Sequence, residues 1–590
     1  MTPCYTHEQI ITLLNNALPS SLILVTSFDD GRKYQNLDEI SNYCSSTSVM
    51  VLLRPVAKTQ EENARIRSAN EKLANSLDEG SLQASSKDFV TSVRLFNFAK
   101  DAHERGANFF VCDDYSLAHE LEQTHPDITI AYHPCVRARF SAIAQNFYLL
   151  DKRTADTFRL IGITGTNGKT TCAHLCGQAL ALLGKDAVVI GTLGAFLYRP
   201  GANGSDVEKE KIKIKQAPLS ALTTPSALQF ARFRYFLQAQ ASRIAASNEI
   251  FICMEVSSHG IDQGRVSDLQ FDIKALTNIT QDHLDYHQNL SAYARVKLDW
   301  LLDGRSRAIS NVQVLDRLEN ASSALKENVQ FFQSLSTGSA QKNAIAHLVS
   351  TVQSESAKHV NSIKLEWEKT TKEHVSASFD TTLIGDFNAE NLSCVALILL
   401  AITSDLEAVA AALTQVNAAP GRLEQVRLND SQAADHPRVY VDYAHTPDAL
   451  ERVLITLGQT KGHNGLLWVV FGCGGDRDTG KRAQMGELAQ RLCQRVVVTN
   501  DNPRSEEPEV IAEMIESGFD CQWPLHARRV LDRREAIVST INEAANDDYV
   551  LIAGKGHEDY QIVGTTTLKF SDVDVAREAL MQRAARAEIA

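Results

Sequence analysis

The stretch that most constrains this chain is residues 161–171, IGITGTNGKTT. The apolar run Phe158–Thr164 predicts a short strand before the glycine-bearing turn, and the pattern TTCAHLCGQALALLG predicts a helix after it, which closes at Gly184. This arrangement cradles phosphate because backbone N–H groups converge on the anion and the helix dipole adds partial positive charge. The alternative is a glycine-rich turn with an exposed lysine. We interpret the stretch as the site of a nucleotide triphosphate.

The phosphate loop has a shortened form, since Ile163 stands where the standard spacing requires glycine. Lys169 can reach the outer phosphates, and the hydroxyl of Thr170 can join the shell of a Mg²⁺ ion. The expected cofactors are therefore ATP and Mg²⁺. The loop residues expected around the phosphates are Gly165, Thr166, Asn167, Gly168, Lys169, Thr170 and Thr171.

Size and charge limit the class of protein. A chain of 590 residues exceeds one hydrophobic core, so several domains are expected. The net charge of −13 argues against a nucleic-acid-binding surface. We expect neither a secretory signal at the start nor a membrane span of about 20 apolar residues. Cys172 and Cys176 lie one helical turn apart without a matching ligand pair, which favours core thiols in a reducing cytoplasm over a metal site.

The order of strand and helix patterns predicts an α/β protein of three domains. We expect a small α/β domain over residues 1–155, a central ATP-binding domain with a mostly parallel sheet over 156–418, and a Rossmann-like domain over 419–590. The polar stretch 200–216 is predicted to be a surface loop. The Ser/Gln/Asn-rich stretch 304–376 is predicted to be a decorated surface segment without chemistry.

Four places in the central region carry polar side chains. Glu255 ends a buried strand, where a carboxylate can bind Mg²⁺ or be an ordinary strand-end residue. The loop 278–287 holds two histidines and two aspartates, which suit metal or phosphate contacts or a helix cap. Asn388 and Asn391, one turn apart, can contact a purine edge or cap their helix. Lys297 lies in a helix pattern, where a lone lysine is usually solvated.

Polar turns follow several strands of the C-terminal region. Arg422 and the stretch 442–445 lie near the domain junction, where a side chain could close over nucleotide. The turns 472–478, 501–504 and 554–558 each follow an expected strand. Two arginines can grip a carboxylate and a nearby carboxylate can hold an ammonium group, so these turns suit a zwitterionic amino acid. Each turn alone could also be ordinary turn chemistry.

The motifs between Arg159 and Gly564 resemble those of the Mur ligases, ATP-dependent amide-forming enzymes of bacterial peptidoglycan synthesis. The motifs that carry the resemblance are TGTNGKTT, TTPSAL, MEVSSHGIDQGRV, TNITQDHLDYH, GDFNAENL, PGRLEQV, VDYAHTPDALE, FGCGGDRDTGKR, DNPRSEEP and AGKGHEDYQIVG. The similarity is strongest to the branch that adds diaminopimelate, since Arg504 in DNPR can pair with a distal carboxylate that lysine lacks.

The resemblance implies a role for each matching residue. Around the magnesium ions it places Thr170, Glu255, His283 and Lys297, the last as a carbamylated lysine. It implies catalytic roles for Lys169, Lys297, His283 and Arg422. Around the nucleotide it places Asn388, Asn391, Arg422, Asp442 and His445. Around a muramoyl dipeptide it places Thr223, Thr224, Ser257, Gln263 and Arg265. Around diaminopimelate it places Arg477, Asp501, Asn502, Pro503, Arg504, Gly554 and Glu558.

The implied reaction forms an acyl phosphate on the D-glutamate side chain of UDP-N-acetylmuramoyl-L-alanyl-D-glutamate, which the amine of meso-diaminopimelate attacks. We also expect a cytoplasmic monomer that binds no nucleic acid. Leu222 replaces an asparagine of the family pattern, and residues 1–130 lack its uridine-binding motifs, with Ser27–Gln35 as a remnant of one. The alternatives are a lysine-adding ligase, a folylpolyglutamate synthase-like ligase, or a nucleotide-gated binding protein without ligase activity.

Overall fold

The structure is a computed structural model that describes most of the chain. The described residues are 6–17, 23–26, 36–38, 48–52, 99–113, 115–133, 136, 139–148, 157–201, 212–214, 222–239, 249–280, 282–317, 329–336, 346–355, 360–370, 373–428, 436–461, 465–520 and 526–587. The stretch 27–35, taken above as a remnant of a uridine motif, lies outside them. The chain divides into two compact units, 1–331 and 332–590, which we describe separately.

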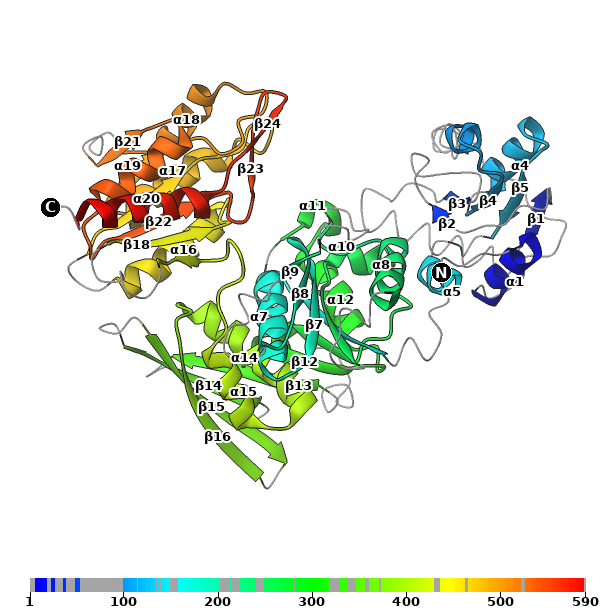
Figure 1. The fold of residues 1–590 in the computed structure, drawn as a ribbon, viewed down its shortest axis with the longest axis horizontal. Helices are drawn as coiled ribbons and strands as arrows, with labels where there is room; N and C mark the ends of the chain where they lie inside the picture. Colours follow the sequence, from blue (N-terminus) through cyan, green and yellow to red (C-terminus); the bar gives the residue numbers. More distant parts are fainter. Residues whose placement is uncertain are drawn as a thin grey trace. The chain divides into compact units, whose positions relative to one another are not determined.

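The first unit begins with a five-stranded sheet in the order β1-β5-β4-β3-β2, in which only β1 is antiparallel to its neighbour (Figure 1). The strands are β1 (Ile23–Thr26), β2 (Asn36–Asp38), β3 (Ser48–Leu52), β4 (Phe109–Cys112) and β5 (Thr129–Tyr132). The helices here are α1 (His7–Ala17), α4 (Tyr115–Thr124) and α5 (Phe140–Phe147). The small α/β domain predicted from the apolar runs is present in these described stretches.

A second sheet of the first unit carries the phosphate loop. Its strands run parallel in the order β12-β11-β6-β10-β7, and β8 and β9 follow antiparallel. The strands are β6 (Phe158–Thr164), β7 (Asp186–Gly191), β8 (Gly194–Tyr198), β9 (Ile212–Lys213), β10 (Ile250–Glu255), β11 (Ile273–Leu276) and β12 (Arg307–Asn311). The helices are α7 (Lys169–Leu182), α8 (Ala227–Ala239), α10 (Ser258–Asp262), α11 (Leu284–His287) and α12 (Leu290–Leu301), and 3-10 helix η2 covers Val312–Arg317.

Apolar runs explain the central position of β6 and β10. Residues of both strands are buried on both faces of the sheet, as continuous apolar parallel strands usually are. One face packs against Phe230 and Phe233 of α8. The other face lies under α7, where a Cβ built on Gly177 would be 2.5 Å from Val189. Cys172 and Cys176 of α7 are buried core thiols, as predicted.

The prediction of a surface segment over 304–376 is wrong for most of its described part. Besides β12, it contains β13 (Val329–Ser336), which spans the division between the units, and the antiparallel strands β14 (Ala346–Glu355), β15 (Val360–Thr370) and β16 (Glu373–Thr381). Alternate residues such as Ile363, Leu365 and Trp367 are buried. The polar residues between them hid this two-residue period. Part of the expected surface loop 200–216 likewise forms β9.

In the second unit, helices α14 (Asp386–Thr403) and α15 (Leu406–Thr414) precede the C-terminal sheet. Of the described helices, α14 is the one long and apolar enough to cross a membrane by length and composition, yet 67% of its apolar window is buried. Its Ser393 hydroxyl lies 2.7 Å from that of Ser350 in β14. These features identify α14 as a core helix.

The C-terminal sheet has the order β17-β18-β22-β19-β20-β21, with every strand parallel except β17. Its strands are β17 (Glu424–Val426), β18 (Arg438–Asp442), β19 (Leu467–Phe471), β20 (Arg495–Val498), β21 (Ala527–Arg529) and β22 (Tyr549–Ala553), and β23 (Tyr560–Val563) pairs with β24 (Thr566–Lys569) in a hairpin. The helices are α16 (Pro447–Thr460), α17 (Lys481–Leu492), α18 (Pro508–Glu516), α19 (Arg533–Glu543) and α20 (Asp572–Ala587).

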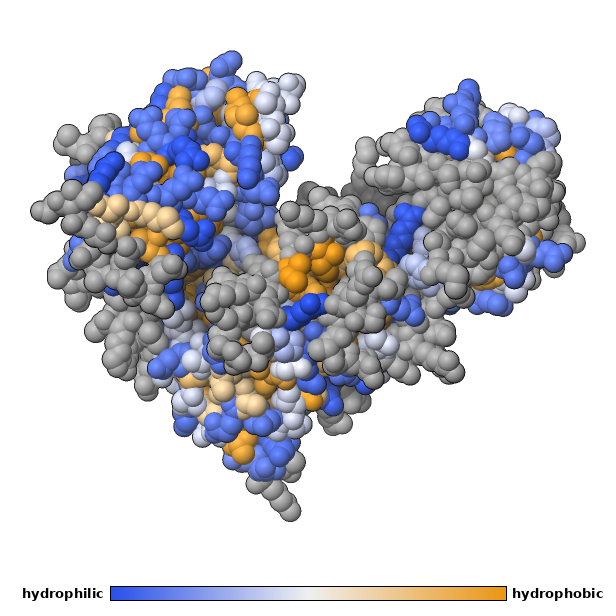
Figure 2. Space-filling view, in the orientation of Figure 1, coloured by the Kyte–Doolittle hydropathy of each residue, from blue (hydrophilic) through white to orange (hydrophobic). Residues whose placement is uncertain are grey.

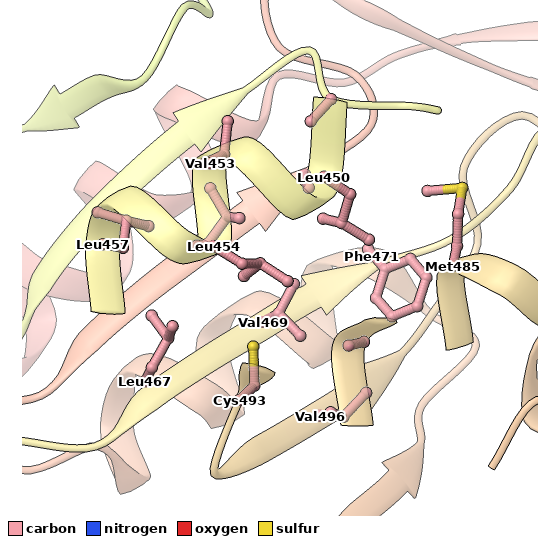
Figure 3. Packing of buried hydrophobic residues seen from close by; sticks show 14 of the residues in the cluster. Leu450, Val453, Leu454, Leu457, Leu467, Val469, Phe471, Met485, Cys493 and Val496 are labelled. Carbon is pink, nitrogen blue, oxygen red and sulfur yellow. The ribbon is translucent and has the colours of Figure 1, made fainter. Parts of the chain in front are cut away.

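Alternation along these strands fills two cores. Leu467, Val469 and Phe471 face α16 and α17, as Figure 3 shows, while Trp468 and Val470 face α19 and α20. The helices therefore cover both faces, which leaves the strand ends open for function. Figure 2 shows that hydrophilic residues dominate the visible described surface, with apolar residues in scattered groups. The predicted α/β class with parallel sheets is confirmed.

Candidate functional site

The phosphate loop joins β6 to α7 through two glycines with positive φ. Gly165 has φ +147°, and a Cβ there would lie 1.9 Å from Thr277 Oγ1. Gly168 has φ +86° and is the N-cap of α7, so Lys169 is the first helical residue. A side chain at either position would be strained, which explains the two glycines. The loop therefore presents the helix N-terminus that suits an anion.

The loop rests on residues 277–280, which follow β11. Thr277 donates its hydroxyl to the carbonyl O of Asn167 at 2.6 Å, and Asn278 Oδ1 accepts from Asn167 N at 3.0 Å. Thr166 Oγ1 donates to Thr280 O at 3.1 Å and accepts from Thr280 N at 2.9 Å. The first part of the predicted polar loop 278–287 therefore holds the phosphate loop in place by hydrogen bonds.

Thr170 and Glu255, both predicted at a metal site, are in direct contact. The Thr170 hydroxyl donates to Glu255 Oε2 at 2.9 Å. Glu255 Oε1 accepts from the backbone N of Thr192 at 2.9 Å, and a Cβ on Gly191 would lie 1.8 Å from the same oxygen. A hydroxyl and a carboxylate at the end of the phosphate loop suit Mg²⁺, which usually combines one or two carboxylates with water and substrate phosphates.

Two lysines converge on the same loop. Lys169 Nζ donates to Gly165 O at 2.9 Å and Thr166 O at 2.7 Å. Lys297 Nζ donates to Gly165 O at 3.0 Å and lies 4.7 Å from the ring centre of Tyr293. Burial, assisted by the nearby Lys169 charge, lowers the pKa of Lys297 well below its usual value. The general expectation of a solvated helical lysine is wrong here, because α12 turns this side chain into the core.

The residues expected around a muramoyl dipeptide form one hydrogen-bonded cluster beside Glu255. Thr224 Oγ1 donates to Ser257 Oγ at 3.1 Å, and Arg265 Nη1 donates to Thr224 O at 2.9 Å. Arg265 Nη2 also donates to Gln263 Oε1 at 2.5 Å. The hydroxyl of Thr192 lies 3.2 Å from both Thr223 Oγ1 and Glu255 Oε2. This cluster therefore reaches the carboxylate expected to hold the metal.

His283 lies on the loop after residue 280 and has φ +52°. Its ring packs edge-on against His259, with ring centres 4.8 Å apart. Within the described ranges there is no group of three or more His, Cys, Asp or Glu side chains that could hold a metal ion. The assignment of His283 to the metal site stays a prediction.

In the second unit, three predicted nucleotide residues surround the end of β18. Asp442 accepts from Leu423 N at 2.6 Å and Ala444 N at 2.7 Å, and burial raises the pKa of its carboxyl group. The Arg422 guanidinium lies 4.9 Å from the ring centre of Tyr443. His445 Nδ1 lies 2.7 Å from Tyr443 O. Asp442 therefore fixes the turn that carries Arg422.

That turn also lies directly on the loop that follows β22. A Cβ on Gly421, which has φ +64°, would lie 2.2 Å from His557 N. The rings of Tyr443 and His557 are 5.1 Å apart. The close backbone approach requires glycine at position 421.

Asn388 and Asn391 are both buried in the first turns of α14. Asn388 Nδ2 donates to Ile384 O at 2.9 Å, and Asn391 Nδ2 lies 3.5 Å from Asn388 Oδ1. The N-cap of α14 is Gly385. Neither asparagine is the N-cap residue, and their contact with adenine stays a prediction.

The two predicted arginines of the amino-acid pocket both approach Gly474, in the turn after β19. A Cβ on Gly474 would lie 3.0 Å from Arg504 Nη1 and 3.7 Å from Arg477 Cγ. Arg504 Nη1 donates to Gly475 O at 2.7 Å. Arg504 also has φ +54°, a backbone conformation that non-glycine residues rarely adopt. Such strain is concentrated at functional positions, where the surrounding structure maintains it.

Asn502 connects this turn to Glu558. Asn502 Nδ2 donates to Glu558 Oε2 at 2.9 Å, and its backbone O lies 3.5 Å from Arg504 Nη1. Lys555 is fully buried, and its Nζ donates to Glu558 Oε2 at 3.0 Å. The group thus combines the Arg504 guanidinium and the Lys555 ammonium with the Glu558 carboxylate, charges that suit recognition of an amino acid.

Asp501 and Gly554 complete the predicted pocket. A Cβ on Gly554, which has φ +114°, would lie 2.6 Å from Asp501 Oδ2. Burial raises the pKa of Asp501, while the charges of Arg533 and Lys555 act to lower it. Pro503, which is buried, follows in the same loop, and a Cβ on Gly475 would lie 1.9 Å from its carbonyl O. The three strand-end turns predicted to act together do lie together.

Family profiles match both regions that hold these clusters. The profile described as the Mur ligase middle domain matches residues 163–399, and the one described as the Mur ligase, glutamate ligase domain matches residues 421–556. A relative from Haemophilus ducreyi is 37% identical over 499 residues, with 82% of this chain and 90% of that protein covered. The chain belongs to the Mur ligase family.

Relatives from this family share one enzyme name. The H. ducreyi protein is named UDP-N-acetylmuramoyl-L-alanyl-D-glutamate–2,6-diaminopimelate ligase, as is one from Rickettsia bellii that is 33% identical over 83% of this chain and 92% of that protein. A solved structure with the same enzyme name has a TM-score of 0.59 and 26% identity and covers 96% of this chain and 98% of its own. A MurF structure from Acinetobacter baumannii, at 13% identity and a TM-score of 0.53, shows the same fold.

Sequence reasoning missed several supporting residues. Thr192 follows a strand beside the phosphate loop, so its position offered a signal. Lys555 lies between two glycines of a motif that was recognised. Arg482 gave no signal, although its buried guanidinium donates to both carboxylate oxygens of Glu506 and to Gly474 O. It therefore supports the turn beside Arg504.

Proposed function

We propose that this chain is an ATP-dependent, ADP-forming ligase that acts in peptidoglycan synthesis. It joins an amine of meso-diaminopimelate to the D-glutamate side-chain carboxylate of UDP-N-acetylmuramoyl-L-alanyl-D-glutamate through an acyl phosphate. The observation that carries this proposal is the group in which Asn502 connects Arg504 to Glu558. The names and coverage of the relatives support it independently.

On the acceptor side, Thr223, Thr224, Ser257, Gln263 and Arg265 bind the dipeptide and place its carboxylate near Glu255. Lys169 exchanges its hydrogen bonds to the loop carbonyls for phosphate oxygens. The buried amine of Lys297 would add to CO2 and lose a proton to give a carbamate, and Thr170, Glu255, His283 and that carbamate would hold the magnesium ions. When bound, Mg²⁺ neutralises charge on the phosphates.

On the amine side, Arg477 and Arg504 bind the distal carboxylate of diaminopimelate, and Glu558 holds its ammonium group. Asn388, Asn391, Asp442 and His445 contact the nucleotide, and Arg422 closes over it. Binding and orientation supply most of the rate enhancement, because phosphoryl and acyl transfer need little protein nucleophilicity. We further propose three domains, bounded at 155 and 418, in a cytoplasmic monomer.

Phosphate release in the presence of ATP, Mg²⁺ and the UDP-linked dipeptide tests this proposal. We expect release to require both the dipeptide and an amino acid, with meso-diaminopimelate preferred over L-lysine by at least tenfold. Equal use of L-lysine would favour the lysine-adding ligase. ATP turnover that ignores both substrates would contradict a ligase and favour a nucleotide-gated binding protein.

A further inference from the structure

A fully buried arginine connects two turns of the amino-acid pocket and has no place in the mechanism above. Arg533 is the first residue of α19, and its side chain has no exposed surface. Its Nε and Nη2 donate to the two carboxylate oxygens of Asp572, at 2.8 and 2.7 Å. Asp572, equally buried, is the first residue of α20. This is the bidentate geometry in which arginine is most specific.

The remaining donors of Arg533 reach the backbone at two strand ends. Nη1 donates to Asn500 O at 3.1 Å, and Nη2 donates to Ala553 O at 2.9 Å. Asn500 directly precedes Asp501, and Ala553 directly precedes Gly554. In the sheet, β19 lies between β20 and β22. Arg533 therefore ties together two pocket turns whose strands are not neighbours.

Asp501 and Gly554 directly follow the two residues whose carbonyl groups Arg533 binds. The two residues approach so closely that a single methyl group on Gly554 would lie 2.6 Å from the Asp501 carboxylate. A buried ion pair is weak evidence for a purely stabilising role, because apolar residues of similar volume can replace it without loss of stability. The four hydrogen bonds donated by the buried Arg533 guanidinium therefore suggest that it fixes the positions of these turns.

We propose that Arg533, held by Asp572, is a positioning residue for the amino-acid substrate. It fixes the turns that begin at Asp501 and Gly554 at the spacing that binding requires. The proposal rests on the proposed function in one respect: the substrate is an amino acid that contacts these turns. Arg533 itself is fully buried and acts on the amino acid only through these turns.

Arg533→Lys is the decisive variant, since lysine keeps the charge but cannot make the forked contacts. We expect the KM for meso-diaminopimelate to rise at least tenfold, because the two turns that bind it would no longer be held at the spacing that binding requires. The KM values for ATP and the UDP-linked dipeptide should stay within twofold of wild type. The measurement is initial-rate phosphate release by the full chain, with the unfolding midpoint recorded in parallel.

The chain offers a matched control one residue along the same helix. Arg534 pairs with Glu578 of α20 at 2.7 Å, but both side chains are more than half exposed. Arg534→Lys should leave all three KM values within twofold, because exposed ion pairs contribute little.

A purely stabilising role would give a different result. In that case Arg533→Lys would lower the unfolding midpoint and the apparent kcat of the ligation reaction, while the KM for diaminopimelate stayed within twofold. That outcome overturns the proposal. If Arg533→Lys does not fold, Asp572→Asn gives the same test with the same expected rise. Wild type assayed in parallel reports separately on the proposed function. If it prefers another amino acid, the KM for that amino acid tests Arg533.

Discussion

Gly191→Ala should disable the metal side of the site without replacing any residue assigned to it, because the new methyl group would displace Glu255. Gly191 ends β7, and its backbone lies outside the left-handed region, so alanine is conformationally acceptable. A Cβ there would lie 1.8 Å from Glu255 Oε1, whereas ordinary contact begins at 3.4 Å. The carboxylate must therefore move by about 1.6 Å.

That displacement is large enough to break the contacts that hold the carboxylate. The hydrogen bonds from Thr170 Oγ1 and Thr192 N to Glu255 are both 2.9 Å long. Misplacement of a reacting group by about 1 Å can cost on the order of a hundredfold in rate, and overpacking typically costs about 1–3 kcal/mol of stability. We expect phosphate release to fall by about a hundredfold with a modest decrease in the unfolding midpoint.

Initial-rate phosphate release at saturating substrates measures this effect, and denaturant unfolding confirms that the variant is folded. The control is Gly458→Ala in α16, where a Cβ meets nothing within 4 Å. That change should leave the rate unaltered and raise stability by about 0.5–1 kcal/mol, since glycine is unfavourable within a helix. A folded Gly191→Ala protein with a rate within threefold of wild type would refute the role given to Glu255.

Three further predictions concern single residues. Lys169→Ala should reduce phosphate release by about 10²–10³-fold, the usual cost of losing one electrostatic stabiliser, and a near-normal rate would contradict the phosphate-loop assignment. Arg504→Ala should raise the KM for meso-diaminopimelate by roughly 10–100-fold, since a charge-assisted hydrogen bond contributes about 1.5–3 kcal/mol, and should leave L-lysine use unchanged; equal losses with both amino acids would argue against a carboxylate contact. Burial lowers the pKa of His287 to about 4 from 6.5. Because the unfolded chain binds more protons between these values, stability should fall as pH decreases through that window, and His287→Phe should reduce the slope of unfolding midpoint against pH.

Sequence patterns predicted the strands around the sites closely. The run Phe158–Thr164 is β6 to the residue, and Tyr549–Ala553 is β22. Both are short, mostly apolar stretches bounded by turn residues, a pattern and length typical of a strand buried on both faces. Thr446 and Pro447 begin α16 as predicted, since Thr446 Oγ1 accepts from Ala449 N.

Tertiary placement was less accessible to sequence reasoning. Strands β14–β16 were missed because Ser, Gln and charged residues occupy their exposed positions. Lys297 and Arg533 both lie in helices whose patterns suggest solvated cations. Their burial depends on which face of the helix meets the sheet, and that choice is made by the packing of the whole domain. The clusters themselves were predictable because parallel strands bring their carboxyl ends to one edge.

The contact of Gly421 with the backbone of His557 has a consequence for how this protein moves. Arg422 follows the first of these residues, and Glu558 follows the second. With no room between the two backbones, neither loop can slide past the other. The backbone segments that carry the arginine expected over the nucleotide and the glutamate expected on the incoming amine should therefore move together, so that a displacement of one loop also displaces the other.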